Sequence, residues 1–364
     1  MVAHVDQAFP GLVQDYEIWN EPDNQGSLCV ADNTDATRRA TYISMYDAAA
    51  LAMHQQALAD SVTIRVGGPG LGSPQGNLAN WVPALLSDTT AAANIDFVSY
   101  HYYPSTVSAV NAGMNWDSST GTTPLYQRTQ DTHTGAAAIF SAASALVKQG
   151  QQANPGATPV LITTFNEDSN WGSDCCRNNA TYGPLWNSLF TVDLLNTVYA
   201  GAQSVPNRMF YYAASIPAGQ FCLLGNLDAN MDCAYTAGTG PVAYPQYYSY
   251  LLFASSKYLG LRTGGNLALS TASSAKNLIA TAFYTLQGDA LALVNPTATD
   301  ATQVPIQASN IGFTTNVQAT VFLLNANNGA ITQQPLALTI SGSTVNGSVT
   351  VPAYSTVGIL ITGS

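Results

Sequence analysis

Polar side chains suited to chemistry follow an alternating run near the start of the chain. The run Asp15–Trp19 alternates apolar and polar residues and is followed directly by Asn20, Glu21 and Pro22. Such alternation is typical of a strand, so the Asn-Glu pair is expected where that strand ends. A shielded glutamic acid can transfer a proton, and a neighbouring amide can bind a hydroxyl group. We therefore predict that Glu21 is a general acid/base and that Asn20 binds substrate.

Further polar groups stand at the ends of two later apolar runs. His101 and Tyr103 end one run, Thr164 and Asn166 end another, and Trp171 lies in the loop that follows. A single histidine in a strand is more often a core residue, and a single tryptophan more often serves packing. Their recurrence at successive strand ends indicates a site that binds a polyhydroxylated substrate, because amides and phenols bind hydroxyls and aromatic rings stack on sugar C–H faces.

Five units, each a strand followed by a helix, are expected to position these groups. The predicted strands cover about residues 16–21, 64–70, 95–104, 159–168 and 208–215, and predicted helices include 35–59, 78–86, 182–199 and 244–258. Apolar strands that alternate with helices predict an α/β fold with a parallel sheet. A dinucleotide-binding fold is excluded, because no glycine-rich phosphate turn follows the first strand.

The pattern changes after Leu261. Short, alternating, β-branched segments separated by turn residues predict an antiparallel β-sandwich. We therefore assign residues 1–262 to a partial (β/α) barrel that carries the catalytic-type residues, and residues 263–364 to the sandwich.

Composition excludes several classes of partner. The 364 residues include 10 Lys and Arg against 21 Asp and Glu, a net charge of −11. Binding to nucleic acid or to an anionic membrane needs clustered basic residues, which this chain lacks, so neither partner is expected. Only 9% of the residues are charged, and this composition favours an exported protein, secreted or periplasmic.

Five cysteines support the same compartment. Cys222 and Cys233 flank a short loop and are predicted to pair, while Cys29 is predicted to pair with Cys175 or Cys176. The alternative is that all five are unpaired thiols of a cytoplasmic protein. No spacing typical of a zinc site occurs, no apolar run is long enough to span a membrane, and the first residues lack the features of a signal peptide.

The motifs WNEP, VGGP, DFVSYHYYP and ITTFN occur in this order within about residues 14–215. Together they resemble the clan A retaining glycoside hydrolases, most closely the family 39 β-xylosidases and their relatives, which are (β/α)8 barrels with an appended β-sandwich. The resemblance implies that Glu21 is the acid/base at the end of the fourth strand and that Asn20 holds the sugar 2-hydroxyl. It places His101 and Tyr103 on the sixth strand, near the nucleophile. It also implies a β-linked plant or microbial saccharide as substrate and no metal or cofactor.

One departure from the family concerns the nucleophile. Relatives carry Glu where this chain has Thr164, and an unactivated hydroxyl cannot replace a carboxylate that must form a glycosyl ester. Three alternatives stay open: Glu167 serves as a surrogate nucleophile or base, water attacks directly with inversion, or catalysis is lost and the protein only binds sugar.

A second departure concerns the barrel itself. If WNEP ends the fourth strand, the five units account for strands four to eight, and residues 1–14 resemble the end of the third helix. An open edge of a parallel sheet invites association. We therefore expect a homo-oligomer, or another covering element, at the edge of the first strand.

Overall fold

The structure of the protein is a computed structural model. It describes residues 2–102, 139, 141–150, 159–165, 209–211, 224–225, 242–243, 245–260, 278–285, 287–295, 299–309, 311, 315–325 and 330–364. These residues divide into two compact units. Four of the predicted site residues, Tyr103, Asn166, Glu167 and Trp171, lie outside the described residues.

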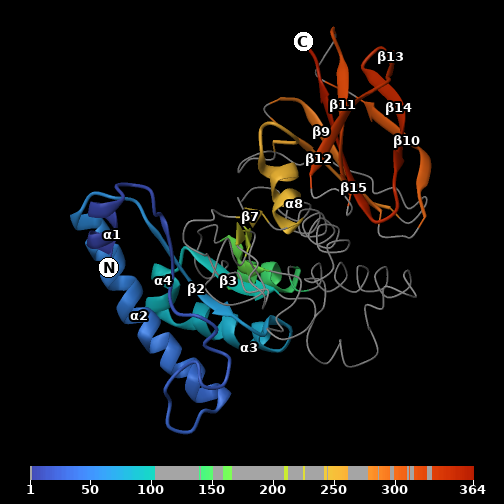
Figure 1. Ribbon diagram of the computed structural model, residues 1–364. Helices are drawn as coiled ribbons and strands as arrows, with labels where there is room; N and C mark the ends of the chain where they lie inside the picture. Colours follow the sequence, from blue (N-terminus) through green and yellow to red (C-terminus); the bar gives the residue numbers. More distant parts are fainter. Residues whose placement is uncertain are drawn as a thin grey trace. The chain divides into compact units, whose positions relative to one another are not determined.

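The first unit is built on a parallel sheet of five strands in the order β1-β2-β3-β4-β5 (Figure 1). The strands are β1 (Asp15–Glu17), β2 (Arg65–Leu71), β3 (Phe97–Tyr102), β4 (Val160–Phe165) and β5 (Met209–Tyr211). Its helices are α1 (Val2–Ala8), α2 (Asp35–Ala59), α3 (Pro74–Ser87) and α4 (Thr89–Asn94), with a further helical stretch at 141–150. The predicted α/β partial barrel is confirmed, and its five strands follow one another along the chain in the predicted order.

Helix α2 covers the predicted range and packs on the sheet through a stripe of large side chains. Thr34 caps its N-terminus by accepting a hydrogen bond from the backbone N–H of Thr37. Tyr42 and Tyr46 are fully buried, and their hydroxyls donate to the carbonyls of Ile18 and Val66. These bonds fix the helix against the segment after β1 and against β2.

Strand β2 can approach its neighbours closely because it is rich in glycine. A Cβ atom on Gly68 would lie 2.1 Å from the hydroxyl of Tyr42, and one on Gly67 would lie 2.3 Å from the ring of Phe97. Both glycines therefore make room for aromatic side chains of α2 and β3. The VGGP motif serves packing at these two positions.

The second unit contains antiparallel sheets. One has the strand order β12-β11-β15-β9-β8, another β10-β14-β13, and a short pair joins β6 to β7. The strands are β6 (Leu224–Gly225), β7 (Val242–Ala243), β8 (Ile279–Tyr284), β9 (Asp289–Asn295), β10 (Ala301–Ser309), β11 (Gln318–Asn325), β12 (Ile331–Leu336), β13 (Thr339–Ser341), β14 (Thr344–Val351) and β15 (Ser355–Thr362), together with helix α8 (Pro245–Ala254).

The two larger sheets of this unit share one hydrophobic core. Val304 and Val349 from the three-stranded sheet belong to the same buried cluster as Val321 and Ile359 from the five-stranded sheet. Two sheets that bury one common set of apolar side chains form a sandwich. On the outer face of the five-stranded sheet, the ring of Phe322 packs edge-on against the ring of Tyr258, which lies just after α8. The two ring centroids are 5.4 Å apart. The predicted domain boundary at residue 262 lies outside the described residues.

One sequence prediction is wrong. Cys29 is an exposed free thiol, so the predicted disulfide between Cys29 and Cys175 or Cys176 is absent. Cys29 is the central residue of a tight turn, in which the N–H of Val30 donates to the carbonyl of Leu28. The other four cysteines lie outside the described residues. None of the helices that the structure describes is both long and apolar enough to cross a membrane.

Candidate active site

The segment after β1 departs from a regular strand before it reaches Glu21. The strand ends at Glu17, although the N–H groups of Ile18 and Glu21 still donate to carbonyls of β2, at 3.0 Å in both cases. Trp19 and Glu21 adopt left-handed backbone conformations, with φ of 71° and 48°. Non-glycine residues rarely adopt such angles, and these two kink the chain at the end of the sheet.

Glu21 and His101 are in direct contact. Nδ1 of His101, on β3, lies 2.7 Å from Oε1 of Glu21. The side chain of His101 is only 3% exposed and that of Glu21 is 29% exposed. The neighbouring β1, β2 and β3 bring together two residues that are far apart in the sequence.

Asn24 supplies a second donor to the same carboxylate. Its Nδ2 atom donates to Oε2 of Glu21 at 2.7 Å. Each oxygen of Glu21 therefore has its own short hydrogen bond, and the orientation of the carboxylate is fixed from both sides.

These contacts set the protonation states of the pair. The hydrogen bond from His101 lowers the pKa of Glu21 below its ordinary value, although partial burial opposes this effect. Burial of the ring lowers the pKa of His101, but the carboxylates of Glu17 and Glu21 outweigh burial and raise it to about 9. At neutral pH, Glu21 is therefore a carboxylate and His101 an imidazolium that donates Nδ1–H to it.

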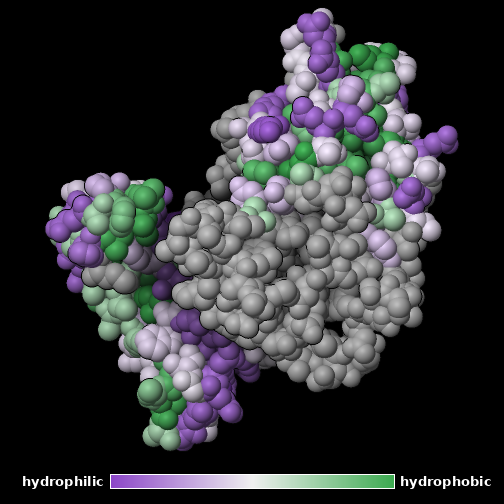
Figure 2. Space-filling view, in the orientation of Figure 1, coloured by the Kyte–Doolittle hydropathy of each residue, from purple (hydrophilic) through white to green (hydrophobic). Residues whose placement is uncertain are grey.

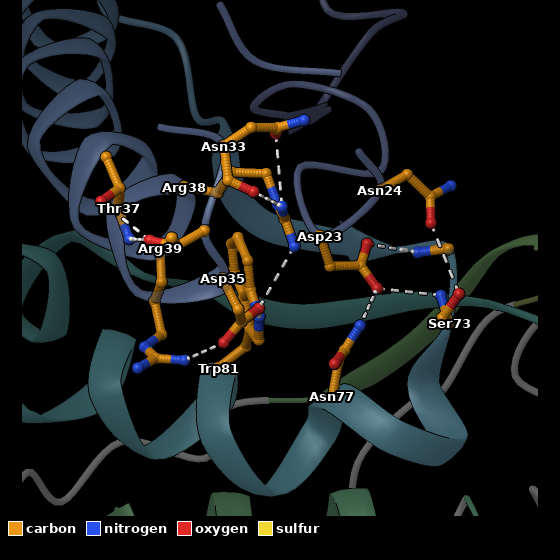
Figure 3. A network of polar contacts seen from close by, with 12 residues as sticks. Asp23, Asn24, Asn33, Asp35, Thr37, Arg38, Arg39, Ser73, Asn77 and Trp81 are labelled. Atoms are coloured by element: carbon orange, nitrogen blue, oxygen red, sulfur yellow. Dashed lines mark hydrogen bonds and ion pairs between the residues drawn. The ribbon is translucent and has the colours of Figure 1, made fainter. Parts of the chain in front are cut away.

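Asp23 anchors the loop that carries Asn24, and the sequence analysis missed this role. The carboxylate of Asp23 is buried and accepts from the N–H groups of Gly72 and Ser73 at 2.8 and 2.9 Å, and from Nδ2 of Asn77 at 2.8 Å (Figure 3). The carboxylate thus satisfies two backbone donors in the turn just before α3 and one side-chain donor within that helix. No periodic pattern in the sequence marks this contact, because its partners lie about fifty residues away.

Glu17 is a second residue that the sequence analysis did not select. Its Oε1 atom lies 3.9 Å from Nε2 of His101, on the side of the ring away from Glu21. The alternation of the first strand contained the signal, because Glu17 lies four residues before Glu21 and shares its parity.

Thr164 lies beside His101, and Asn20 lies apart from the pair. Thr164 is half-buried on β4 and is the direct register partner of His101. Asn20 is exposed, and its backbone carbonyl accepts the hydroxyl of Ser27 at 2.7 Å. The structure therefore brings Glu21, His101 and Thr164 to neighbouring strand ends.

The cluster of Glu17, Glu21 and His101 can hold and transfer protons. Within the described part of the chain, no group of three or more His, Cys, Asp or Glu side chains is arranged to hold a metal ion. The side chains of Glu17, Glu21 and His101 can transfer protons and form hydrogen bonds with a polar ligand.

Comparison with protein families identifies relatives of the segment that carries these residues. Residues 13–134 match the glycosyl hydrolases family 39. The resemblance to this family is thus confirmed over that range, which includes Glu21 and His101, while the part from there to residue 215 stays a prediction. No curated protein sequence matches the chain.

Solved structures show the same fold. A family 30 endoxylanase from Clostridium papyrosolvens C71 is 14% identical, with a TM-score of 0.57, and the match covers 100% of this chain and 68% of that one. A monomeric β-xylosidase from Caulobacter crescentus CB15 is 15% identical, with a TM-score of 0.55, over 100% and 73% of the two chains. A family 44 xyloglucanase from Paenibacillus polymyxa is 15% identical, with a TM-score of 0.58, over 96% and 66%. At these identities the likeness shows the fold.

Proposed function

We propose that the protein is a glycoside hydrolase that acts on β-linked plant or microbial saccharides, with Glu21 as its general acid/base. The observation that carries this proposal is the 2.7 Å contact between Glu21 and the buried ring of His101, within the segment that matches family 39. The match to a glycoside hydrolase family supports a carbohydrate substrate. Asn20, Tyr103, Asn166 and Trp171 are proposed to contact that sugar.

The pair can supply both halves of acid/base catalysis. A departing sugar oxygen needs a proton, and the pair holds one on the imidazolium of His101, next to Glu21. The proton moves from Nδ1 of His101 to the Glu21 carboxylate and from there to the leaving oxygen. As the bond to the leaving oxygen breaks, the sugar carbon must bond to a nucleophile, the role predicted for Glu167. Water then displaces that nucleophile, and Glu21, again a carboxylate, accepts a proton from the water. His101 regains its proton when Glu21 returns the one taken from water.

Thr164 favours a second candidate, a carbohydrate-binding protein with weak or lost catalysis. Thr164 is the register partner of His101 and occupies the position where the family resemblance leads us to expect a carboxylate nucleophile. Without that group the covalent step of a retaining enzyme has no acceptor. Glu167 remains the predicted surrogate nucleophile or base, and an export compartment remains part of this proposal.

Hydrolysis of unactivated β-linked oligosaccharides tests the proposal. Nitrophenyl β-xyloside, β-glucoside and β-galactoside first locate the preferred sugar, and the assay then uses an oligosaccharide of that sugar. We expect Glu21→Gln to reduce turnover by about a hundredfold or more, because a poor leaving group needs acid assistance. Asp60→Asn is the matched control, since Asp60 is an exposed carboxylate at the C-terminal end of α2.

Two results would contradict the assignment. If Glu21→Gln retained most of the activity on the unactivated oligosaccharide, Glu21 would not be the acid/base. If the wild-type protein bound the oligosaccharide in calorimetry without any turnover, the binding protein would be the correct candidate.

A further inference from the structure

The ring of His101 lies between two carboxylates. Oε1 of Glu17 is 3.9 Å from Nε2, while Oε1 of Glu21 is 2.7 Å from Nδ1. The His101 side chain is 3% exposed, so water has little access to replace either carboxylate. The proposed mechanism uses Glu21 and leaves Glu17 without a role.

The backbone of β2 makes the space that Glu17 occupies. Gly70 has a left-handed φ of 61°, and a Cβ atom there would lie 2.9 Å from Oε1 and 3.0 Å from the carboxyl carbon of Glu17. The N–H of Gly70 donates to the buried hydroxyl of Ser99 on β3 at 3.0 Å. This bond holds Gly70 in place, so the carboxylate of Glu17 is confined between the backbone and His101.

The two ring nitrogens of His101 constrain its protonation state. Nδ1 must carry a proton to bond the carboxylate of Glu21. If Nε2 carried none, its lone pair would face the negative carboxylate of Glu17, an unfavourable arrangement. Nε2 and Oε2 of Glu17 are both buried, and neither has a hydrogen-bond partner within the described residues. A proton on Nε2 turns this repulsion into attraction.

We propose that Glu17 is a positioning residue, which holds His101 in the doubly protonated form and orients its Nδ1–H toward Glu21. The role of this ring in catalysis rests on the function proposed above, whereas the pairing of Glu17 with His101 does not. Glu17 itself touches no reacting atom in this proposal and acts through the imidazole.

The charged groups that face the ring, among the residues that the structure describes, are Glu17 from β1 and Glu21 from the following turn. Tyr42 approaches Glu17 from α2 and stays neutral, because burial raises the pKa of its phenol well above the ordinary range. On β3 itself, burial likewise raises the pKa of Tyr100. Thr164 on β4 does not titrate. A change at Glu17 therefore alters the principal charge on the Nε2 side.

Nuclear magnetic resonance titration of the histidine rings tests the proposal without any need for activity. The chain has four histidines, and the His101 signal is identified by its loss in His101→Gln. We expect His101 to titrate near pH 9 in the wild type, and its midpoint to fall by about one pH unit or more in Glu17→Gln, because an opposite charge at this distance stabilises the imidazolium.

Asp15→Asn is the matched control. Asp15 lies on the same strand and is paired with Arg65, so its loss should leave the His101 midpoint unchanged. Glu17→Asp keeps the charge but shortens the side chain, so we expect a His101 midpoint between those of the wild type and Glu17→Gln. If Glu17→Gln does not fold, the midpoint in Glu17→Asp tests the proposal in its place. An unchanged midpoint in folded Glu17→Gln, checked by near-ultraviolet circular dichroism, would overturn the proposal.

The titration also separates this proposal from the proposed function. If the midpoint falls while the wild type hydrolyses no glycoside, Glu17 positions His101 as proposed and the enzymatic function is wrong. If the wild type is active, we expect Glu17→Gln to move the alkaline limb of its pH–rate profile to lower pH.

Discussion

The hydrogen bonds to Glu21 favour its ionised form, whereas a general acid must be protonated before it can act. His101 and Asn24 donate to the two oxygens of Glu21, both at 2.7 Å, and favour its charged form. Many glycosidases are described as keeping the acid protonated by burial or by a nearby carboxylate. Here the proton rests on the adjacent imidazole instead. Catalysis by this site would therefore depend on His101 as much as on Glu21.

Thr164 allows a direct test of the missing nucleophile. Thr164→Glu places a carboxylate beside His101, and we expect β-glycosidase activity to rise a hundredfold or more, on the order of 3 kcal/mol of transition-state stabilisation. Thr164→Gln is the control, because it adds similar bulk without the charge. Initial rates on the aryl glycosides measure the effect. Robust wild-type turnover that Glu167→Gln removes and Thr164→Ala leaves untouched would show that Glu167 has taken the role.

The raised pKa of His101 predicts how stability depends on pH. The folded protein binds this proton more tightly than the unfolded chain, with a pKa of about 9 against 6.5. The stabilisation is therefore fully present below about pH 6.5 and is lost as pH rises through 9. Urea titrations should show the free energy of unfolding falling by about 2 to 3 kcal/mol over this window. His101→Gln should flatten this part of the curve, and an equal slope in that variant would contradict the prediction.

At the scale of secondary structure, the glycines of β2 decide how closely α2, β2 and β3 pack. Gly67 and Gly68 contact aromatic side chains of the neighbouring elements, while Gly70 makes room for Glu17. One strand thus positions the helix layer and part of the candidate site. Asp23 performs a similar task for the loop, because it ties the segment after β1 to the start of α3.

Two glycine-to-alanine substitutions separate the effect of steric packing on stability from the effect of backbone flexibility. Gly67→Ala would place Cβ 2.3 Å from the ring of Phe97 and 2.4 Å from its carbonyl, and we expect a loss of about 3 kcal/mol in the free energy of unfolding. Gly76 lies in α3 with nothing within 4 Å of the new Cβ, so Gly76→Ala should be neutral or stabilising by up to about 1 kcal/mol. Urea unfolding measures both. Equal effects of the two substitutions would disprove the packing explanation.

At the scale of the whole molecule, the edge of β1 opposite β2 is where we expect a partner. Among the described strands β1 pairs with β2 alone, and it is only three residues long, which itself limits edge pairing. Large apolar side chains are exposed nearby in the sequence: Phe9 (56% exposed), Leu12 (74%), Val13 (39%) and Trp19 (48%). Figure 2 shows hydrophobic surface in the region of α1.

We expect a second copy of the chain to cover this surface. Light scattering should then report a dimer or larger assembly, and Leu12→Lys should shift it toward the monomer. Ile340→Lys is the control, because Ile340 is a similarly exposed apolar residue in the second unit. A monodisperse wild-type monomer at all concentrations would contradict this prediction.

Much of the fold could be predicted from the sequence because its signals are local. The periodicity of 35–59 predicted a helix with the bounds that α2 has, and the apolar runs predicted β2 to β5 in their chain order. The first strand was predicted too long. The predicted strand runs to Glu21, but left-handed conformations at Trp19 and Glu21 interrupt the regular pairing, and no side-chain pattern encodes such angles.

The sequence alone determined which chemical groups the candidate site contains: a carboxylate after a strand, an imidazole on a later strand, and a threonine where a family carboxylate was expected. Only the tertiary structure decided how they meet. Parallel strand register brings His101 to Glu21, a left-handed glycine makes room for Glu17, and the buried carboxylate of Asp23 holds the loop of Asn24. These contacts link residues from about 50 to 84 positions apart in the chain. The physical reason is that residue type and periodicity are local properties, whereas contact depends on how separate elements align in space.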